Sequence, residues 1–444
     1  MENLETRKEM DRGLFLLEEG RPLLEKLPAD RWDQIFAGLY VVLGILMWNC
    51  LCMENFARGL SMFSILYVIT VLAYARLKKF SITGEKIFWT LILLGISLPY
   101  GFYTVFGFGQ TLMIFLVAAY WTLVITEGLL WKGATSSWVL LDSWNGLIAL
   151  PILNSLCQIR LLFQSFSVKK EEKRDWRMVL LGIIISIPAL LIIVPILSQA
   201  DTGFRNLVSA ILDLLGADFR ILIWRGIVGI LLGALMFGTL YGGAYKRHVK
   251  EEECIHFHEE SGRVFRFVPD IAVLTFGVIV SAVYLLFIGL QARYLFSAFF
   301  GILPEAYTYA QYARQGFFEL CVIALLNASF LIAMNSCAKT PRRKNRGLIL
   351  ENGILGVLTL LLLSTAASKL GMYIAAYGFT VKRCISSVFL IWLILVFILV
   401  LIYQKKNIPL VRRAVFAGAV LFTLLCVLPV EQIIGWIPYN PVSG

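Results

Sequence analysis

The chain has 444 residues, of which 59% are hydrophobic and only 16% are charged, and its formal net charge is +11. Soluble globular domains carry about 25% charged residues, and a chain this apolar has too little polar surface to cover a water-facing fold. The composition therefore excludes an ordinary soluble domain and predicts an all-α, polytopic membrane protein. The positive net charge is typical of membrane proteins, which carry an excess of Lys and Arg on their cytoplasmic side. The sequence contains no nucleic-acid-binding motif, so we expect no nucleic-acid partner.

A helix that crosses the lipid bilayer needs about 20 mostly apolar residues, and the sequence predicts eleven such spans. The run 87–126 contains no charged residue and is long enough for two of them. Gly and Pro residues interrupt this run, and we place its turn at 106–109. The other spans are expected at 34–53, 59–75, 178–200, 226–245, 271–290, 320–338, 352–368, 384–403 and 414–430.

The distribution of Lys and Arg indicates that the N-terminus is cytoplasmic and the C-terminus lies outside. With eleven spans, the N-terminal segment and the even-numbered connections share one side, and they hold 31 of the 40 Lys and Arg residues. Such a bias is typical of cytoplasmic loops, and one span more or fewer would reverse it downstream. The densest of these loops, 339–346, could also contact anionic lipid.

Two apolar segments do not fit a simple span. Residues 138–157 include Asp142 and Asn154, and we interpret them as an interfacial or re-entrant helix on the cytoplasmic side. Residues 204–223 carry four charged residues and predict an amphipathic helix on the outer face.

The expected organisation has three parts. An amphipathic, cytoplasmic lead-in occupies 1–34, a transmembrane bundle occupies 35–430, and a short outer tail occupies 431–444. No internal repeat is evident, so self-similarity does not support an inverted-repeat transporter.

Polar and aromatic residues converge on the predicted outer side, around the eighth span and the connection between the ninth and tenth. Arg and Tyr side chains there could bind the phosphate or carboxylate of a small-molecule or anionic-lipid ligand. The alternative is structural: the tyrosines would form an interfacial belt, and Arg314 and Glu319 an ion pair. The candidate ligand-binding residues are Gln291, Arg293, Glu305, Tyr309, Tyr312, Arg314, Glu319, Tyr377, Lys382 and Arg383, with Lys369 and Tyr373 beside them.

Inside the predicted spans, the polar residues are mainly amides and hydroxyls. Asn327, Asn335 and Asn352 are expected to bond neighbouring helices. With the ninth span at 352–368, no charged residue lies deep within a span. Intramembrane charges mark ion and proton pathways, so this pattern argues against proton coupling and voltage sensing.

The motif Tyr-Ala-Gln-Tyr-Ala-Arg-Gln-Gly-Phe-Phe-Glu-Leu at 309–320 resembles that of a bacterial membrane-protein family described as a domain of unknown function, of the 4153/4173 type. The resemblance covers about 180–405. It implies a multi-pass protein of the bacterial cytoplasmic (inner) membrane and supplies no activity. The family tends to have a longer C-terminal tail than this chain. Further similar segments are 283–287, 291–296 and 377–383, the tenth span with Trp392, and, more weakly, 235–241.

No residue set predicts catalysis or a cofactor. Cys254, His256 and His258 lie in a short charged loop without the spacing of a structural zinc site, so we expect a solvated loop and no metal. The motifs of known hydrolases, metalloproteases and nucleotide-binding proteins are absent from the sequence. We therefore expect no cofactor, and the sequence favours a non-enzymatic protein.

Three function classes remain open. The first is a permease or export component for a small or lipid-linked solute. The second is a membrane-embedded sensor or accessory subunit, whose segments 1–34 and 131–177 would contact a membrane or cytoplasmic protein partner. The third is an intramembrane transferase acting on lipid carriers, for which an evident base or metal set is lacking.

Overall fold

The computed structural model describes residues 27–131, 133–165, 193–214, 217–249, 266–290 and 309–436, together with the isolated positions 182, 186, 190 and 299. The described regular structure is helical, apart from an isolated bridge between Val268 and Ala338. The described helices are α2 (Arg31–Leu51), α3 (Phe56–Leu77), α4 (Gly84–Tyr100), α5 (Phe108–Thr126), α6 (Val139–Trp144), the π-helix η1 (Asn145–Ala149), α7 (Leu150–Ser165), α9 (Thr202–Leu214), α10 (Ala217–Ala244), α12 (Asp270–Leu290), α14 (Tyr309–Cys337), the 3₁₀ turn η4 (Arg342–Lys344), α15 (Arg346–Tyr377), α16 (Val381–Lys405), α17 (Leu410–Val427) and α18 (Val430–Trp436).

Within the described ranges, ten helical segments are long and apolar enough to cross a membrane. The chain is therefore a multi-pass membrane protein of the all-α class, as its composition predicts. Nine of the ten coincide with predicted spans, and the tenth is 139–164. Helix α4, with 17 residues, fills another predicted position at the lower limit of spanning length. The predicted span at 178–200 lies mostly outside the described residues.

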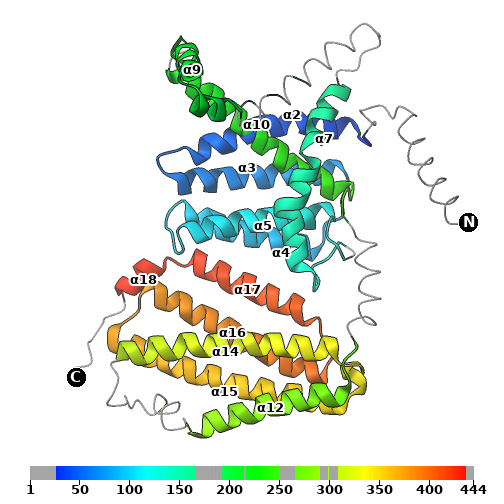
Figure 1. Ribbon diagram of the computed structural model, residues 1–444, viewed down its shortest axis with the longest axis vertical. Coiled ribbons are helices and arrows are strands. Elements are labelled where there is room, and N and C mark those ends of the chain that lie inside the picture. Colours follow the sequence, from blue (N-terminus) through cyan, green and yellow to red (C-terminus); the bar gives the residue numbers. More distant parts are fainter. Residues whose placement is uncertain are drawn as a thin grey trace, which may run out of the picture.

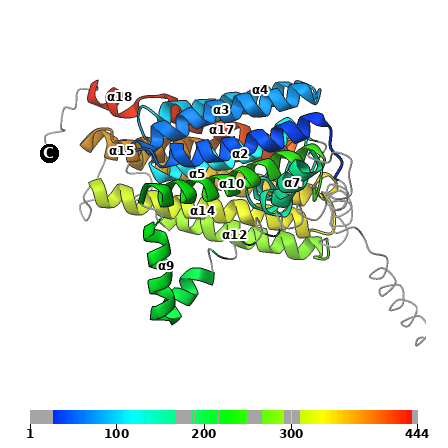
Figure 2. The same ribbon diagram turned by 90° about the horizontal axis from the view of Figure 1, so that it is seen from above.

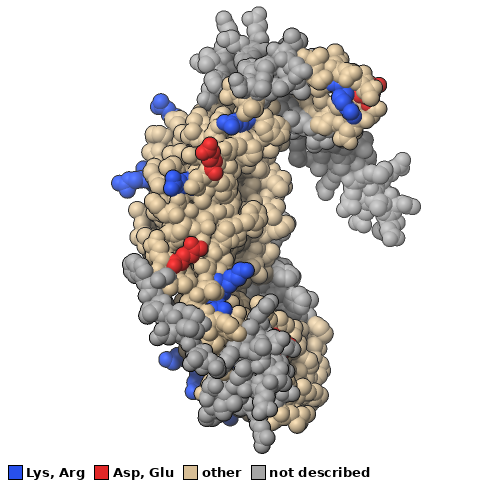
Figure 3. Space-filling model, turned by 90° about the vertical axis from the view of Figure 1, so that its left-hand side faces the viewer, with Lys and Arg blue, Asp and Glu red and all other residues tan. Residues whose placement is uncertain are grey.

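The bundle helices run side by side in an elongated array (Figures 1 and 2). One end holds the start of α2 and the ends of α3, α5, α10, α14 and α16, at the right of Figure 1. The described basic loops 78–86, 339–346 and 404–413 all lie there, and we term it the basic end. Figure 3 looks at the opposite end, where charged side chains are scattered singly among uncharged ones. This alternation agrees with the predicted topology, and the cytoplasmic assignment of the basic end stays a prediction.

The segment α6–η1–α7 lies across the bundle helices and does not run parallel to them (Figures 1 and 2). It packs against α2, α5 and α10 towards the basic end. Its length and composition alone would allow a span. A crosswise placement is the one expected of an interfacial or re-entrant helix.

The predicted amphipathic helix at 204–223 is wrong in its boundaries. Helix α9 ends at Leu214, and the residues from Ala217 onward belong to α10. Helix α9 stands off the bundle, as Figures 2 and 3 show. The predicted lead-in lies outside the described residues up to position 26, and Arg31 already begins α2, where Asp30 and Asp33 form a capping box.

The hydrophobic core of the described residues has two large parts and a small third cluster formed by Val273, Met334, Ala338 and Leu348. One is formed by α2, α3, α4, α5, α7 and α10, and the other by α12, α14, α15 and α16. Helix α17 joins them, because it packs against α4 on one side and α16 on the other. Trp392 of α16 donates a hydrogen bond to the carbonyl of Ala414 in α17 at 3.0 Å.

Helices α2 and α10 approach each other at glycines. A Cβ atom added to Gly44 would lie 2.1 Å from the carbonyl oxygen of Gly229, and one added to Gly233 would lie 2.2 Å from that of Tyr40. Lipid and leucine are equally apolar, so helices in a membrane associate through such close backbone contact. The pairs Gly229–Gly233 and Gly238–Gly242 each have the spacing that permits it.

At the basic end, a buried carboxylate ties three helices together. Asp33 is fully buried, and its carboxylate accepts hydrogen bonds from Tyr74 of α3 at 2.7 Å and from Tyr245 after α10. Lys78 forms ion pairs with Asp33 at 3.0 Å and with Asp30 at 2.9 Å. Partial burial lowers the pKa of Lys78, but its hydrogen bonds to Tyr245 and the two carboxylates outweigh this effect and hold the pKa above its ordinary value. The ammonium group therefore stays charged and joins α2, α3 and α10.

The glycine contact predicts a selective loss of stability. We expect Gly233→Ala to force α2 and α10 apart and to cost about 1–3 kcal/mol, as overpacking in a tight interface does. The measurement is the apparent melting temperature of the purified protein in detergent. Gly226→Ala is the matched control on the same helix, since nothing lies within 4 Å of a Cβ added there. Equal melting temperatures for the two variants would contradict the assigned contact.

Candidate functional site

Helix α15 carries a line of buried polar side chains through the C-terminal half of the bundle. The line consists of five side chains, and each of them is at most 4% exposed. With their partners on α12, α14 and α16 they form what we term the polar seam. Its members on α15 are Glu351, Asn352, Thr359, Thr365 and Lys369.

The length of α15 shows that the helix includes two buried charged residues, Glu351 and Lys369, one at each margin of the predicted span 352–368. The helix begins after Asn345, whose side chain caps it by accepting from the amide of Leu348, and ends at Gly378, which has φ +73°. It is 32 residues long, so it extends past the predicted span 352–368 at both ends. The predicted span was limited to uncharged residues, so it ended before Glu351 on one side and Lys369 on the other. The helix continues past both residues, because neighbouring helices surround their side chains.

At the basic end of the seam, Glu351 is held by α12. Its carboxylate accepts a hydrogen bond from the hydroxyl of Ser281 at 2.6 Å. Gly277 makes room for it, because a Cβ there would lie 2.5 Å from the Cγ atom of Glu351. The carboxylate of Glu351 is therefore buried between α12 and α15, and its oxygens can accept further hydrogen bonds.

Next to Glu351, three amides from three helices meet. Asn352 donates to the side-chain oxygen of Asn335 on α14 at 3.0 Å and to that of Gln404 on α16 at 3.3 Å. Asn335 also donates to Asn352 at 3.3 Å. These contacts confirm that Asn335 and Asn352 bond neighbouring helices, as the sequence predicts.

In the middle of the seam, Asn327 of α14 donates to the hydroxyl of Thr359 at 2.9 Å, and both side chains are fully buried. Thr359 in turn donates to the carbonyl of Leu355 one turn earlier at 2.7 Å. The hydrogen bond between α14 and α15 therefore lies well inside the protein, in a place where lipid and bulk water do not reach.

At the other end of the seam, Lys369 is 1% exposed. It packs on α14 at Gly316, where an added Cβ would lie 2.7 Å from the Lys369 Nζ atom. The carboxylate of Glu319, one turn further along α14, attracts this ammonium group. A larger residue in place of Gly316 would displace the Lys369 side chain, so the position of the lysine depends on the glycine.

The seam is long enough to cross the apolar part of a membrane. Glu351 and Lys369 are 18 residues apart on one helix, which corresponds to about 27 Å at about 1.5 Å per residue. The hydrocarbon core of a bilayer is about 30 Å thick. Two ionisable groups thus lie near opposite ends of one spanning helix, with amide and hydroxyl groups between them.

Sequence reasoning missed Glu351 as a site residue and placed Lys369 only beside the outer cluster. A usable signal was present. Asn352 and Thr359 are seven residues apart, and Asn327 and Asn335 are eight apart, so each pair lies on one face of its helix. Two polar faces in adjacent spans predict a shared polar contact.

The predicted outer cluster is only partly within the described residues. Gln291, Arg293 and Glu305 lie outside them. For Tyr309, Tyr312 and Arg314 the structure gives a place in α14 but not the side chains, so the predicted Arg314–Glu319 ion pair is untested. Tyr377 and Lys382 are exposed at the ends of α15 and α16.

Arg383 has a structural role in the described part of this cluster. Its guanidinium group donates to the carbonyl oxygens of Tyr377, at 2.8 Å, and of Gly378, at the C-terminal end of α15. The same group lies 4.0 Å from the ring centroid of Tyr373. Arg383 therefore caps α15 and stacks on it, which favours the structural interpretation for this residue.

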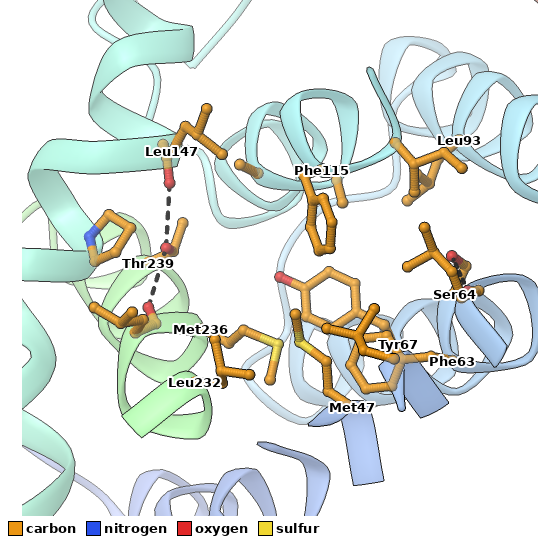
Figure 4. A pocket seen from close by; sticks show the side chains of 18 of the residues that line it. Met47, Phe63, Ser64, Tyr67, Leu93, Phe115, Leu147, Leu232, Met236 and Thr239 are labelled. Carbon is orange, nitrogen blue, oxygen red and sulfur yellow. Dashed lines mark hydrogen bonds between the residues drawn. The ribbon is translucent and has the colours of Figure 1, made fainter. Parts of the chain in front are cut away.

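The N-terminal half contains an apolar cavity of about 430 Å³ between α2, α3, α5, η1 and α10 (Figure 4). The hydroxyls in its wall are bonded to the protein: Tyr67 to Thr122 at 2.8 Å, and Thr239 to the carbonyl of Gly146 at 3.3 Å. Trp48 also lines it, and its Nε1 atom is buried without a hydrogen-bond partner within the described residues. This cavity suits a hydrocarbon chain better than a charged solute.

The described residues contain no group of three or more His, Cys, Asp and Glu side chains that could hold a metal ion. Cys254, His256 and His258, the sequence's one cluster of this kind, lie outside them. The polar seam therefore stands as the candidate site, and its chemistry is that of charge and hydrogen bonding.

The capping role of Arg383 yields a test. We expect Arg383→Ala to destabilise the protein by about 1–2 kcal/mol, because charged hydrogen bonds to the end of α15 and the stacking on Tyr373 are lost. Lys382→Ala, at the exposed neighbouring position, is the control and should leave the apparent melting temperature in detergent unchanged. If the two variants melt alike, Arg383 does not hold the end of α15.

Comparison with known proteins gives a family for this chain but no activity. The chain matches no curated protein and no solved structure. A family model described as "Domain of unknown function (DUF4153)" matches residues 34–435, which is nearly the whole chain and more than the resemblance at 180–405 indicated. The protein therefore belongs to the DUF4153 family.

Proposed function

We propose that the protein is a permease for a small anionic solute, in the bacterial cytoplasmic membrane, with proton movement coupled to transport along the polar seam. The observation that carries this proposal is the burial of Glu351 and Lys369 on one membrane-crossing helix. Function is argued from this site, because the family supplies no activity.

The two ionisable groups have different roles in this proposal. Lys369 is a compact positive charge, which attracts a carboxylate or phosphate group of the solute. Glu319 lies beside it and would be exchanged for the incoming anion. Glu351 near the basic end is the group that takes up and releases the proton. Carboxylates in such positions are characteristic of proton relays in pumps and transporters.

The amides and hydroxyls of the seam alone would also be explained by helix association. Hydrogen bonds between membrane helices contribute about 0.6 kcal/mol each on average, and Asn and Thr are sufficient for them. A seam that only holds helices together has no need of a buried lysine and a buried glutamate, whose desolvation is costly. The charges therefore favour transport over a purely structural seam.

The test uses the full chain reconstituted in liposomes on a solid-supported membrane, with a panel of small carboxylates, phosphates, cations and neutral solutes. We expect a transient current with at least one anion and a dependence on the pH gradient. Glu351→Gln and Lys369→Met should each reduce that current by at least about tenfold, because intramembrane charges of this kind carry the transport path. Lys406→Ala, at an exposed position outside the polar seam and outside the predicted outer cluster, should keep it.

Currents with cations only, or anion currents that survive both substitutions, would contradict the proposal. The protein content and apparent melting temperature of each liposome preparation separate loss of transport from loss of the folded protein.

A further inference from the structure

A groove between α3 and α4, at the basic end, combines apolar walls with a basic rim. Its volume is about 600 Å³, within the range of small-ligand sites. It is separate from the polar seam, since it lies in the N-terminal half. Its walls include Leu72 of α3, Ile87 and Leu91 of α4, and Ile125 at the end of α5.

The walls of the groove face outward from the bundle. Leu72, Ile87 and Leu91 are 40%, 52% and 63% exposed. In a membrane these side chains meet hydrocarbon rather than water, because α3 and α4 run through the bilayer at this point. The groove is therefore open to the acyl chains of a lipid.

The rim carries a surplus of positive charge. Arg76 and Lys79, both exposed, and Lys86 line the groove. Within the described residues, no carboxylate lies within ion-pair distance of Arg76 or Lys79. The neighbouring acids are already engaged: Glu127 pairs with Lys86 at 2.7 Å, and Glu85 with Arg412 at 2.7 Å.

Two further features define the conformation of the loop between α3 and α4, which carries part of the basic rim. Lys79 follows the end of α3 with φ +58°, a left-handed conformation that favours glycine or asparagine, yet a lysine occupies it. Lys86 donates to the carbonyl of Ser81 at 2.8 Å as well as to Glu127, which closes the loop between α3 and α4. The hydrogen bond from Lys86 also holds the pKa of Glu127 below its ordinary value, so the pair stays charged.

We infer that this groove binds a diacyl phospholipid with an anionic headgroup, with its phosphate between Arg76 and Lys79 and one acyl chain along Leu72, Ile87 and Leu91. Charge complementarity selects an anionic over a zwitterionic lipid, and the apolar walls select a lipid over a free phosphate. The basic rim lies at the end of the bundle where a headgroup would sit.

The test is native mass spectrometry of the purified full-length protein in detergent, titrated with phosphatidylglycerol, phosphatidylcholine or glycerol 3-phosphate. We expect phosphatidylglycerol to bind most tightly and glycerol 3-phosphate not to bind. The double substitution Arg76→Gln with Lys79→Gln should weaken phosphatidylglycerol binding about tenfold or more, as loss of two charges near an anionic headgroup predicts.

Two further variants separate the groove from general surface charge. Leu91→Trp fills the apolar wall without changing a charge, and should also weaken phosphatidylglycerol binding. Arg343→Gln with Lys344→Gln removes two exposed charges at the same end of the bundle and should leave binding unchanged.

Three results would overturn the inference: equal binding of phosphatidylcholine, binding of glycerol 3-phosphate as tight as that of the lipid, or equal loss in the two double variants. Equal loss in the two double variants would mean that the lipid is attracted by the total charge of the basic end and not by this groove. Arg76 and Lys79 are exposed, so their substitution leaves the packed core intact, and the apparent melting temperature checks this.

Discussion

A lipid bilayer offers no hydrogen bonds to a helix that crosses it, so polar side chains inside a span bond either to a carbonyl of their own helix or to a partner on a neighbouring helix. In the C-terminal half this constraint decides how the helices are arranged. Asn352 can be satisfied only where α14, α15 and α16 meet, and Glu351 only where α12 passes α15. The register of these four helices follows from those contacts, and the apolar residues around them fill the remaining space.

The N-terminal half meets the same constraint differently. Its close contact between α2 and α10 depends on glycines, and Asp33 and Lys78 form an ionic network at the basic end. Asp33 is buried there, but Lys78 and two tyrosines surround it, so its charge is compensated by the protein. The N-terminal half thus combines close backbone contact with this network, and the C-terminal half buries Glu351 and Lys369 on α15. Because α17 packs against both, a movement of one half would be transmitted to the other.

Much of the fold could be predicted from the sequence, because apolar length and loop charge are local properties. The spans α2, α3, α5 and α16 fall where uncharged runs predict them, and the described basic loops share one end. The turn predicted at 106–109 contains Gly107, which has φ +54° and directly precedes α5. Pairing between helices is not local, so neither the α2–α10 contact nor the polar seam followed from span prediction. The rule that a charge ends a span fails for α15, where Glu351 and Lys369 are enclosed by protein.

The central claim is that Glu351 and Lys369 are kept for function, at a cost in stability. Replacing a buried ion pair by apolar residues of similar size is often neutral or stabilising, whereas removing only one partner of the pair destabilises. The most direct measurement is the apparent melting temperature in detergent of the double variant Lys369→Met with Glu319→Gln, compared with the wild-type protein, because this variant removes both charges of the pair. We expect a melting temperature that is unchanged or higher. A drop as large as that caused by a packing defect would contradict it, because the lysine would then be part of what holds α14 and α15 together.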